Sequence, residues 1–359
     1  MNDAIDVLKL LNDKINKSYI VGGFVRDYLL KRGSPDIDIA TSMPYEKVIV
    51  VLKDYIVNTN KNYFNVNIKY NNIPMQVTSF RIEHDYLDFR RPSKISYTSS
   101  FIEDLQRRDF TINTFAIDEN GNVLDLLNGS YDLSCRLIKT VGSADIKIKE
   151  DALRILRAIR FCIILDFKLD EELKIAIMKY RENIKYLSKQ VIKKEIDILF
   201  GHKFVLKSLE IFKEFDLISI LEIKNTSKFN PTFDILGNYM QLVNIDSYPF
   251  TKQELKIIRK LNALTNSNLK NPINLFNHSF FQIKIACQIK NEDFDKIKNI
   301  YKNMEIKYYK DLEITTDEII KLTLSNYKLV KSIKEDIIQK ILIGDIKNDK
   351  RSIKHYLIS

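Results

Sequence analysis

The spacing of apolar and polar residues changes character about 150 residues into the chain. Before that point, short runs rich in β-branched and aromatic residues alternate with helical patterns, which predicts a mixed α/β region. Asn71 and Asn72 separate two such runs, and asparagines are typical of a hairpin turn. The predicted strands cover residues 19–21, 37–40, 64–70 and 75–80, and the predicted helices cover 4–15, 25–31 and 45–55.

From Glu150 onward, apolar residues recur every three or four positions almost throughout, as they do in amphipathic helices. Asn230-Pro231 and Asn271-Pro272 mark breaks between later helical blocks. The pattern therefore predicts an α+β protein, with a mixed α/β head that contains a small β-sheet and an all-helical region after it. The clearest helical segments are 151–165, 171–180 and 189–200.

The charge balance favours a polyanionic partner, because 57 basic residues outnumber 47 acidic ones in a chain of 359 residues. A solvated lysine-rich surface would give the same excess, so charge alone does not decide the matter. Three cysteines at no metal-binding spacing favour a reduced, cytoplasmic protein. The N-terminus lacks the features of a signal peptide, and no apolar run approaches membrane-spanning length, so no membrane partner is expected.

The most informative segment is a glycine turn that is followed by paired carboxylates. Gly22 and Gly23 come directly after a predicted strand, and glycines let backbone N–H groups approach a ligand closely. Arg26 adds a positive charge, and Asp36 and Asp38 can share one face of the next strand because alternate strand residues point the same way. These are the parts needed to hold a nucleoside triphosphate with Mg²⁺, although an Asp-x-Asp pair alone is common in surface loops.

A second segment, residues 103–113, has the pattern of an amphipathic helix. An ordinary charged helix would look the same if it stood alone. Beside a triphosphate site, however, Arg108 can pair with phosphate oxygens in a bidentate way that lysine cannot. The neighbouring Asp109 could accept a hydrogen bond from a ribose hydroxyl, which would favour ribonucleotides over deoxyribonucleotides.

A third segment places Asp151, Arg154, Arg157 and Arg160 at helical spacing, so their charges are expected along one face. The simpler alternative is an exposed helix face with salt bridges. The more specific interpretation is base recognition, because aspartate accepts from an exocyclic amino group while arginine donates to a ring nitrogen or carbonyl. Cytosine and adenine both offer that amino group beside an acceptor. One Asp–Arg pair could therefore accept C and A and reject U and G without a template.

Together these segments resemble the class II tRNA nucleotidyltransferases and their bacterial poly(A) polymerase relatives, and most closely the CCA-adding enzymes. The resemblance extends in order over the first half of the chain, through residues 21–27, 36–41, 107–113 and 150–154. It implies Mg²⁺ ligation by Asp36 and Asp38, triphosphate contacts from Gly23, Arg26 and Arg108, nucleotide selection by Asp151 and Arg154, and further nucleotide contacts from Arg157 and Arg160.

The resemblance also implies a head at residues 1–140, a neck with the nucleotide-selecting helix at 141–203, and a helical body and tail at 204–359 that binds the acceptor arm and 3′ end of tRNA. The implied reaction is the template-independent addition of C, C and A to the 3′ end of tRNA from CTP and ATP by two-metal nucleotidyl transfer; it releases pyrophosphate and needs no protein partner. Three alternatives remain: an A-adding specialist that works with a separate CC-adding enzyme, a poly(A) polymerase, and a non-catalytic RNA-binding protein.

Two details refine this picture. Residues 80–92 resemble the flexible loop of family members that add the terminal A, which favours full CCA or A addition. Gln76 stands where relatives commonly place an acidic residue, so a third carboxylate beside the metal ions is in doubt.

Overall fold

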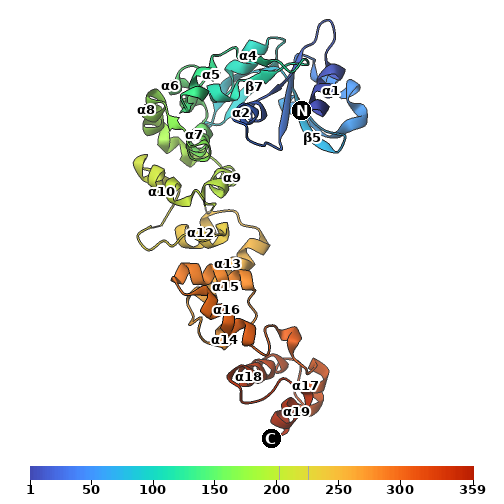
Figure 1. Ribbon diagram of the computed structural model, residues 1–359, viewed down its shortest axis with the longest axis vertical. Coiled ribbons are helices and arrows are strands. Elements are labelled where there is room, and N and C mark those ends of the chain that lie inside the picture. Colours follow the sequence, from blue (N-terminus) through green and yellow to red (C-terminus); the bar gives the residue numbers. More distant parts are fainter. Residues whose placement is uncertain (202, 225) are drawn as a thin grey trace. The chain divides into compact units, whose positions relative to one another are not determined.

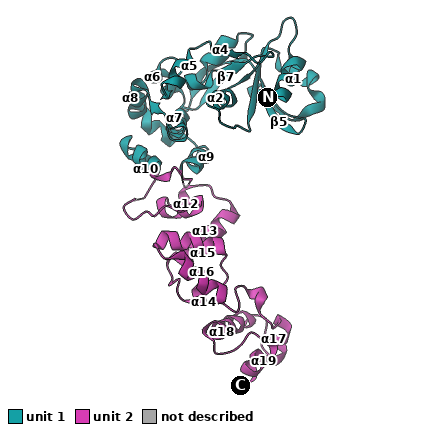
Figure 2. Ribbon diagram, viewed as in Figure 1, with its two compact units in different colours: residues 1–199, 207–221 teal, residues 200–206, 222–359 magenta. Residues whose placement is uncertain are grey.

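The computed structural model describes residues 1–201, 203–224 and 226–359, which form two compact units. Unit 1 contains residues 1–199 and 207–221, and unit 2 contains residues 200–206 and 222–359 (Figure 2). The expected fold class is confirmed, because a mixed sheet near the N-terminus is followed by a largely helical chain (Figure 1). The finer division into head, neck, body and tail stays a prediction.

The sheet of the head has the strand order β3-β4-β5-β2-β1-β8-β9. β2 and β5 are parallel, and the other neighbouring strands are antiparallel. The predicted Asn71-Asn72 turn is confirmed, since both residues have positive φ between β4 and β5. The strands are β1 (Ser18–Val21), β2 (Ile37–Thr41), β3 (Ile56–Asn60), β4 (Asn65–Tyr70), β5 (Ile73–Ser79), β8 (Ala116–Ile117) and β9 (Val123–Leu124).

Helices α1 (Asn2–Leu11) and α3 (Tyr45–Val51) pack against this sheet and bury its main apolar cluster. α2 (Gly23–Leu29) follows β1 directly, so it begins at the glycine turn. The predicted helices are therefore present but end earlier than expected, and the last becomes the short 3-10 helix η1 (Lys53–Tyr55). A second 3-10 helix, η2 (Lys61–Tyr63), joins β3 to β4.

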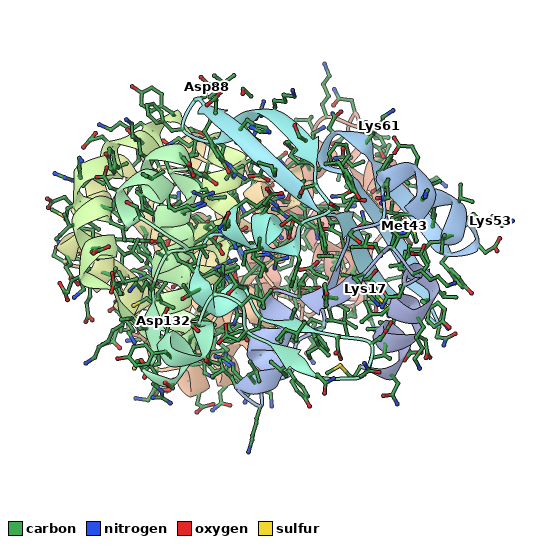
Figure 3. All side chains as sticks on the ribbon, turned by 90° about the horizontal axis from the view of Figure 1, so that it is seen from above. Lys17, Met43, Lys53, Lys61, Asp88 and Asp132 are labelled. Atoms are coloured by element: carbon green, nitrogen blue, oxygen red, sulfur yellow. The ribbon has the colours of Figure 1, made fainter. Side chains whose placement is uncertain are left out.

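Two expectations for the head are wrong in detail. The segment at 80–92, expected as a loop, lies in an ordered hairpin of β6 (Arg81–Leu87) and β7 (Arg91–Tyr97), with Asp88 in its turn at the outer end (Figure 3). The helix expected over 103–113 is only α4 (Phe101–Gln106), followed by the 3-10 helix η3 (Thr111–Asn113). The helix stops because the next backbone groups bond elsewhere: Thr111 donates to the Lys139 carbonyl, and Val141 donates to the Asp109 carbonyl.

The rest of the chain up to residue 221 is mainly helical, and α7 buries the apolar residues Leu156, Ile159 and Ile163. β10 and β11 form a short parallel pair, so this region is not purely helical. The elements are α5 (Gly129–Ser134), β10 (Leu137–Ile138), α6 (Ala144–Glu150), α7 (Leu153–Leu165), β11 (Lys168–Leu169), α8 (Glu171–Tyr180), η4 (Arg181–Tyr186), α9 (Lys189–Leu199), α10 (Val205–Glu214) and α11 (Leu217–Ile220).

Unit 2 is helical and has apolar clusters of its own. Within the residues that the structure describes, no helix is long and apolar enough to cross a membrane. The helices of unit 2 are α12 (Ile235–Leu242), η5 (Ile245–Ser247), α13 (Lys252–Thr265), α14 (Pro272–Leu275), α15 (Phe280–Lys290), α16 (Phe294–Asn303), η6 (Tyr309–Asp311), α17 (Thr316–Thr323), α18 (Val330–Ile343) and α19 (Lys350–Ile358).

Candidate active site

A cavity of about 770 Å³ in unit 1 collects every site residue that the sequence predicts. Its walls come from the glycine turn, from β2, from the segment after α4, and from α7. Residues that are up to 138 positions apart in the chain therefore share one space. The predicted residues that line it are Gly22, Gly23, Arg26, Asp36, Asp38, Arg108, Asp109, Asp151, Arg154, Arg157 and Arg160.

Gly22 forms the turn between β1 and α2 with a φ of 76°, a conformation that favours glycine. A Cβ at this position would lie 3.6 Å from Nη1 of Arg108 and 3.7 Å from Oδ2 of Asp38. A guanidinium and a carboxylate thus approach the same small volume above the glycine. That combination suits a metal ion and the phosphate that shares it, because the carboxylate attracts the cation and the guanidinium attracts the anion.

The two predicted carboxylates, Asp36 and Asp38, line the cavity at the start of β2. Asp36 directly precedes the strand, and Asp38 lies on it opposite Val21 of β1 and Gln76 of β5. Desolvation raises the pKa of Asp38. The positive charge of Arg108 lowers this pKa, and the negative charge of Asp36 raises it further. In the described part of the chain, no cluster of three or more histidine, cysteine or acidic side chains could hold a metal ion. Two carboxylates nevertheless fit Mg²⁺, which commonly takes its remaining ligands from water and substrate phosphates.

Arg26 is buried and is held by the residue next to it and by η3. Its Nε and Nη2 donate to Asp27 at 3.0 and 2.9 Å, and its Nη1 donates to Oδ1 of Asn113 at 2.6 Å. These bonds use one N–H of each nitrogen, which leaves one N–H on each Nη for a ligand. Gly23 adjoins this end of the guanidinium, since its missing Cβ would lie 3.5 Å from Nη2.

Arg108 is positioned from the opposite side of the cavity by Asp104, a fully buried carboxylate of α4. Its Nη2 donates to Asp104 at 3.2 Å, and its Nη1 donates to the Asn113 carbonyl at 3.2 Å. Among the described residues, its buried Nε has no hydrogen-bond partner. An unsatisfied buried donor of a charged group is costly, and an anionic ligand would supply the missing acceptor.

Asp109 and Arg157 form an ion pair across the cavity wall. Oδ2 of Asp109 accepts from Nε of Arg157 at 2.7 Å, and its Oδ1 accepts from the Phe110 amide and from Nδ2 of Asn113. Burial alone would raise the pKa of Asp109, but Arg157 and these hydrogen bonds bring it well below its ordinary value. Asp109 is therefore a fixed anion, already engaged on both oxygens.

The predicted base-selecting pair lies where α6 meets α7. Asp151 has extended backbone between the two helices, so it is not on the helical face that the spacing indicated, whereas Arg154, Arg157 and Arg160 are on α7. Arg154 is only 4% exposed and donates to the Lys147 carbonyl at 2.7 Å and to Glu150 at 3.0 Å. Burial raises the pKa of Asp151, against the opposing effects of nearby arginines.

Comparison with known proteins decides the family. Residues 18–139 match the model of the poly A polymerase head domain. The chain is 32% identical to the CCA-adding enzyme of Listeria innocua, with 99% of both chains covered. It is 31% identical to the CCA-adding enzyme of Bacillus subtilis, with 99% of this chain and 97% of that enzyme covered. The chain belongs to the class II CCA-adding enzymes. The predicted tRNA nucleotidyltransferase activity, CCA addition to tRNA, is thereby confirmed.

Solved structures confirm the fold of this CCA-adding family. The Bacillus stearothermophilus CCA-adding enzyme in complex with CTP matches with a TM-score of 0.85 at 23% identity, covering 99% of this chain and 96% of that one. The Thermotoga maritima CCA-adding enzyme complexed with tRNA matches with a TM-score of 0.70 at 20% identity, covering 99% and 94%.

The β6–β7 hairpin contacts the predicted base-selecting pair, which the sequence did not indicate. Nη1 of Arg90 donates to Oδ2 of Asp151 at 2.9 Å, and the Phe89 carbonyl accepts from the Ala152 amide at 2.9 Å. Nη2 of Arg154 donates to the hydroxyl of Tyr86 at 3.2 Å. The hairpin therefore contacts both Asp151 and Arg154.

The structural importance of Asn113 is not apparent from the sequence. This side chain accepts from Arg26 and donates to Asp109, while its backbone carbonyl accepts from Arg108. Asn113 thereby joins the glycine turn to the segment after α4. Its place at the end of the 107–113 motif was visible, but its partner Arg26 lies 87 positions away, and nothing local in the sequence indicates that contact.

Proposed function

We propose that the CCA addition of this enzyme is a nucleotidyl transfer in the cavity of unit 1, and that this one cavity serves all three additions, C, C and A. The terminal ribose hydroxyl of the tRNA attacks the α-phosphorus of CTP or ATP, the new P–O bond forms and pyrophosphate leaves. The observation that carries the proposal is the convergence of Asp38 and Arg108 over Gly22. A carboxylate that can bind a metal ion and a guanidinium that can bind a phosphate, both close to Gly22, suit a metal-bound triphosphate.

Asp36 and Asp38 are proposed as the Mg²⁺ ligands. When bound there, the metal would activate the attacking hydroxyl and stabilise the charge of the leaving pyrophosphate. Gln76, directly beside Asp38 in the sheet, donates through its side-chain amide to Asn67 at 3.1 Å. A neutral amide engaged in this way adds no third carboxylate, so Asp36 and Asp38 are the proposed carboxylate ligands of the metal.

The triphosphate is proposed to lie between Arg26 and Arg108. Each arginine is clamped by a carboxylate, Asp27 or Asp104, and retains N–H groups that have no partner among the described residues. Clamped guanidinium groups lose little conformational entropy when they bind phosphate, so the site is preorganised. The glycine turn supplies backbone N–H groups at close range.

Base selection is proposed for Asp151 and Arg154. Aspartate would accept from the amino group of cytosine or adenine, and arginine would donate to the adjacent acceptor, whereas uracil and guanine present the reverse order. The hydrogen bonds to the Lys147 carbonyl and Glu150 fix the direction of the Arg154 guanidinium. A fixed donor discriminates better than a mobile one because it cannot turn to suit the wrong base.

Binding of tRNA is proposed for the basic surface of the helical region. An A-form acceptor stem hides its sequence, so lysines and arginines would contact its phosphates and its shape. The Thermotoga maritima CCA-adding enzyme has been solved in complex with tRNA, which agrees with this assignment. The excess of ten basic residues over acidic ones supplies the charge that such contacts need.

The test uses three tRNA transcripts that lack CCA, end in C, or end in CC, incubated with Mg²⁺, CTP and ATP and resolved at single-nucleotide length. Growth of all three to CCA, followed by arrest, supports the proposal. Extension of only the CC-ended transcript would instead identify an A-adding specialist, and long adenylate tails would identify a poly(A) polymerase. Omission of Mg²⁺, or the Asp38→Asn variant, provides the inactive control.

A further inference from the structure

The ring of Phe161 occupies an unusual position among the charged residues of the cavity. Phe161 lies on α7, is 8% exposed and lines the cavity wall. The guanidinium carbons of Arg160, Arg26 and Arg157 lie 4.7, 4.9 and 5.5 Å from the centre of its ring. All three distances are within the range of about 6 Å over which a cation is attracted to an aromatic face.

Three guanidinium groups so close together repel one another, and each is only partly compensated. Each has a carboxylate on another side: Arg26 pairs with Asp27 at 2.9 Å, Arg157 with Asp109 at 2.5 Å, and Arg160 with Glu195 at 3.2 Å. Burial lowers the pKa of Arg160, and the positive charges of Arg157 and Arg26 lower it further against the pull of Glu195. A further attraction shared by the three guanidinium groups would offset part of the repulsion that their carboxylate partners leave.

An aromatic ring can do this where an aliphatic side chain cannot. The face of the ring carries negative electrostatic potential, and its attraction for a cation grows when both are removed from water. The orientation of Phe161 is also fixed, since Phe110 packs against it edge-to-face at 5.8 Å and is fully buried. A leucine at this position would fill similar space without attracting any of the three cations.

We propose that Phe161 is a positioning residue that holds Arg26, Arg157 and Arg160 at the spacing that receives the phosphates of the incoming nucleotide. The proposal rests on the proposed function, in which Arg26 contacts the triphosphate, and on the nucleotide contacts that the family resemblance implies for Arg157 and Arg160. The ring itself touches no reacting atom in this scheme. Arg160 is held on its other side by Glu195, whose Oε2 lies 3.2 Å from Nε of Arg160. The ring thus gathers donors that a substrate anion would complete.

The test replaces Phe161 with mono-, di- and trifluorinated phenylalanine in the full-length enzyme. Fluorine keeps the shape of the ring but weakens its negative face step by step. The KM for CTP on a tRNA without CCA is expected to rise at each step, by about tenfold in total, which corresponds to one desolvated cation–π contact. The kcat and the KM for tRNA are expected to stay within about twofold, since neither depends on the ring in this proposal.

The matched control is the same fluorinated series at Phe115, a fully buried ring of the apolar core of the head. Among the described residues, no cation is recorded over its face. A flat KM across the Phe161 series, or an equal rise in the Phe115 series, would overturn the proposal while leaving CCA addition by the parent enzyme intact. If the parent enzyme fails to extend tRNA at all, the proposed function fails instead, so the two failures are distinguishable.

Discussion

Replacing Arg154 with alanine should damage base selection more than tRNA binding. In the structure, this guanidinium makes hydrogen bonds to the Lys147 and Arg107 carbonyls, to Glu150 and to the Tyr86 hydroxyl. In the proposed complex it also donates to the base. The variant therefore removes two kinds of interaction, one that stabilises the fold and one that distinguishes bases, and each has its own magnitude.

The cost in stability follows from the lost hydrogen bonds. The contacts to the Lys147 carbonyl at 2.7 Å and to Glu150 at 3.0 Å are the strong ones, and Glu150 is 31% exposed, so water can replace part of its loss. We expect the free energy of unfolding to fall by about 2–4 kcal/mol. Loss of a bidentate base contact should reduce discrimination by about 1–3 kcal/mol, which is roughly 5- to 150-fold.

The assay compares kcat/KM for CTP and UTP on a tRNA without CCA, and for ATP and GTP on a tRNA that ends in CC. Arg154→Lys keeps the charge but loses the planar fork, so it should lose most of the discrimination too. Ile159→Ala on the same helix is the matched control, because this fully buried residue should cost about 2–5 kcal/mol without facing the base. Unchanged discrimination in Arg154→Ala, or an equal loss in Ile159→Ala, would refute the reasoning.

Three further predictions concern the metal site, the hairpin and unit 2. Asp36→Ala or Asp38→Ala should abolish nucleotide addition but keep the Kd for tRNA within about threefold. The Kd is measured by gel shift, and Asp54→Ala, at an exposed position, is the control. Addition near the parent rate in either variant would contradict the metal assignment. Arg90→Ala should lower the KM for CTP by about two- to fivefold, because the base would no longer compete with Arg90, whose side chain is 37% exposed, for Asp151. A higher KM in this variant would show that Arg90 assists binding. Burial, with repulsion from Lys260, lowers the pKa of His278 from 6.5 to about 4. Between these pH values the unfolded chain binds more protons than the folded one, so the free energy of unfolding should fall by roughly 1–2 kcal/mol as the pH drops from 6.5 to about 4. In denaturant titrations, the free energy of unfolding of His278→Gln should depend less on pH than that of the parent. An unchanged dependence on pH would contradict the assignment.

Local pattern predicted the elements whose stability depends on nearby residues. The strand before Gly22, the Asn71-Asn72 turn and the helix at Leu153–Leu165 all appear where the spacing placed them. Their signals are short-range, because strand alternation, turn conformation and helical periodicity each involve residues within a few positions of one another.

The predictions that went wrong involve segments whose hydrogen bonds run to distant parts of the chain. Residues 107–113 lack a continuous helix because Thr111 and the Asp109 carbonyl pair with residues 139–141 instead. The β6–β7 hairpin escaped notice because many of its side chains are polar and few are buried, so its pattern is that of a loop. Asp151 left the expected helical face because α6 ends just before it.

Residue types and short spacings were enough to indicate the family, the glycine turn, the two candidate aspartates and the arginines of α7. The partner that holds each charge could be identified only from the folded chain. Asn113 reaches Arg26 across 87 positions and Arg90 reaches Asp151 across 61. Such pairings depend on where packing brings the elements, since a side-chain hydrogen bond requires atoms within about 3 Å. No periodicity along the chain encodes that proximity.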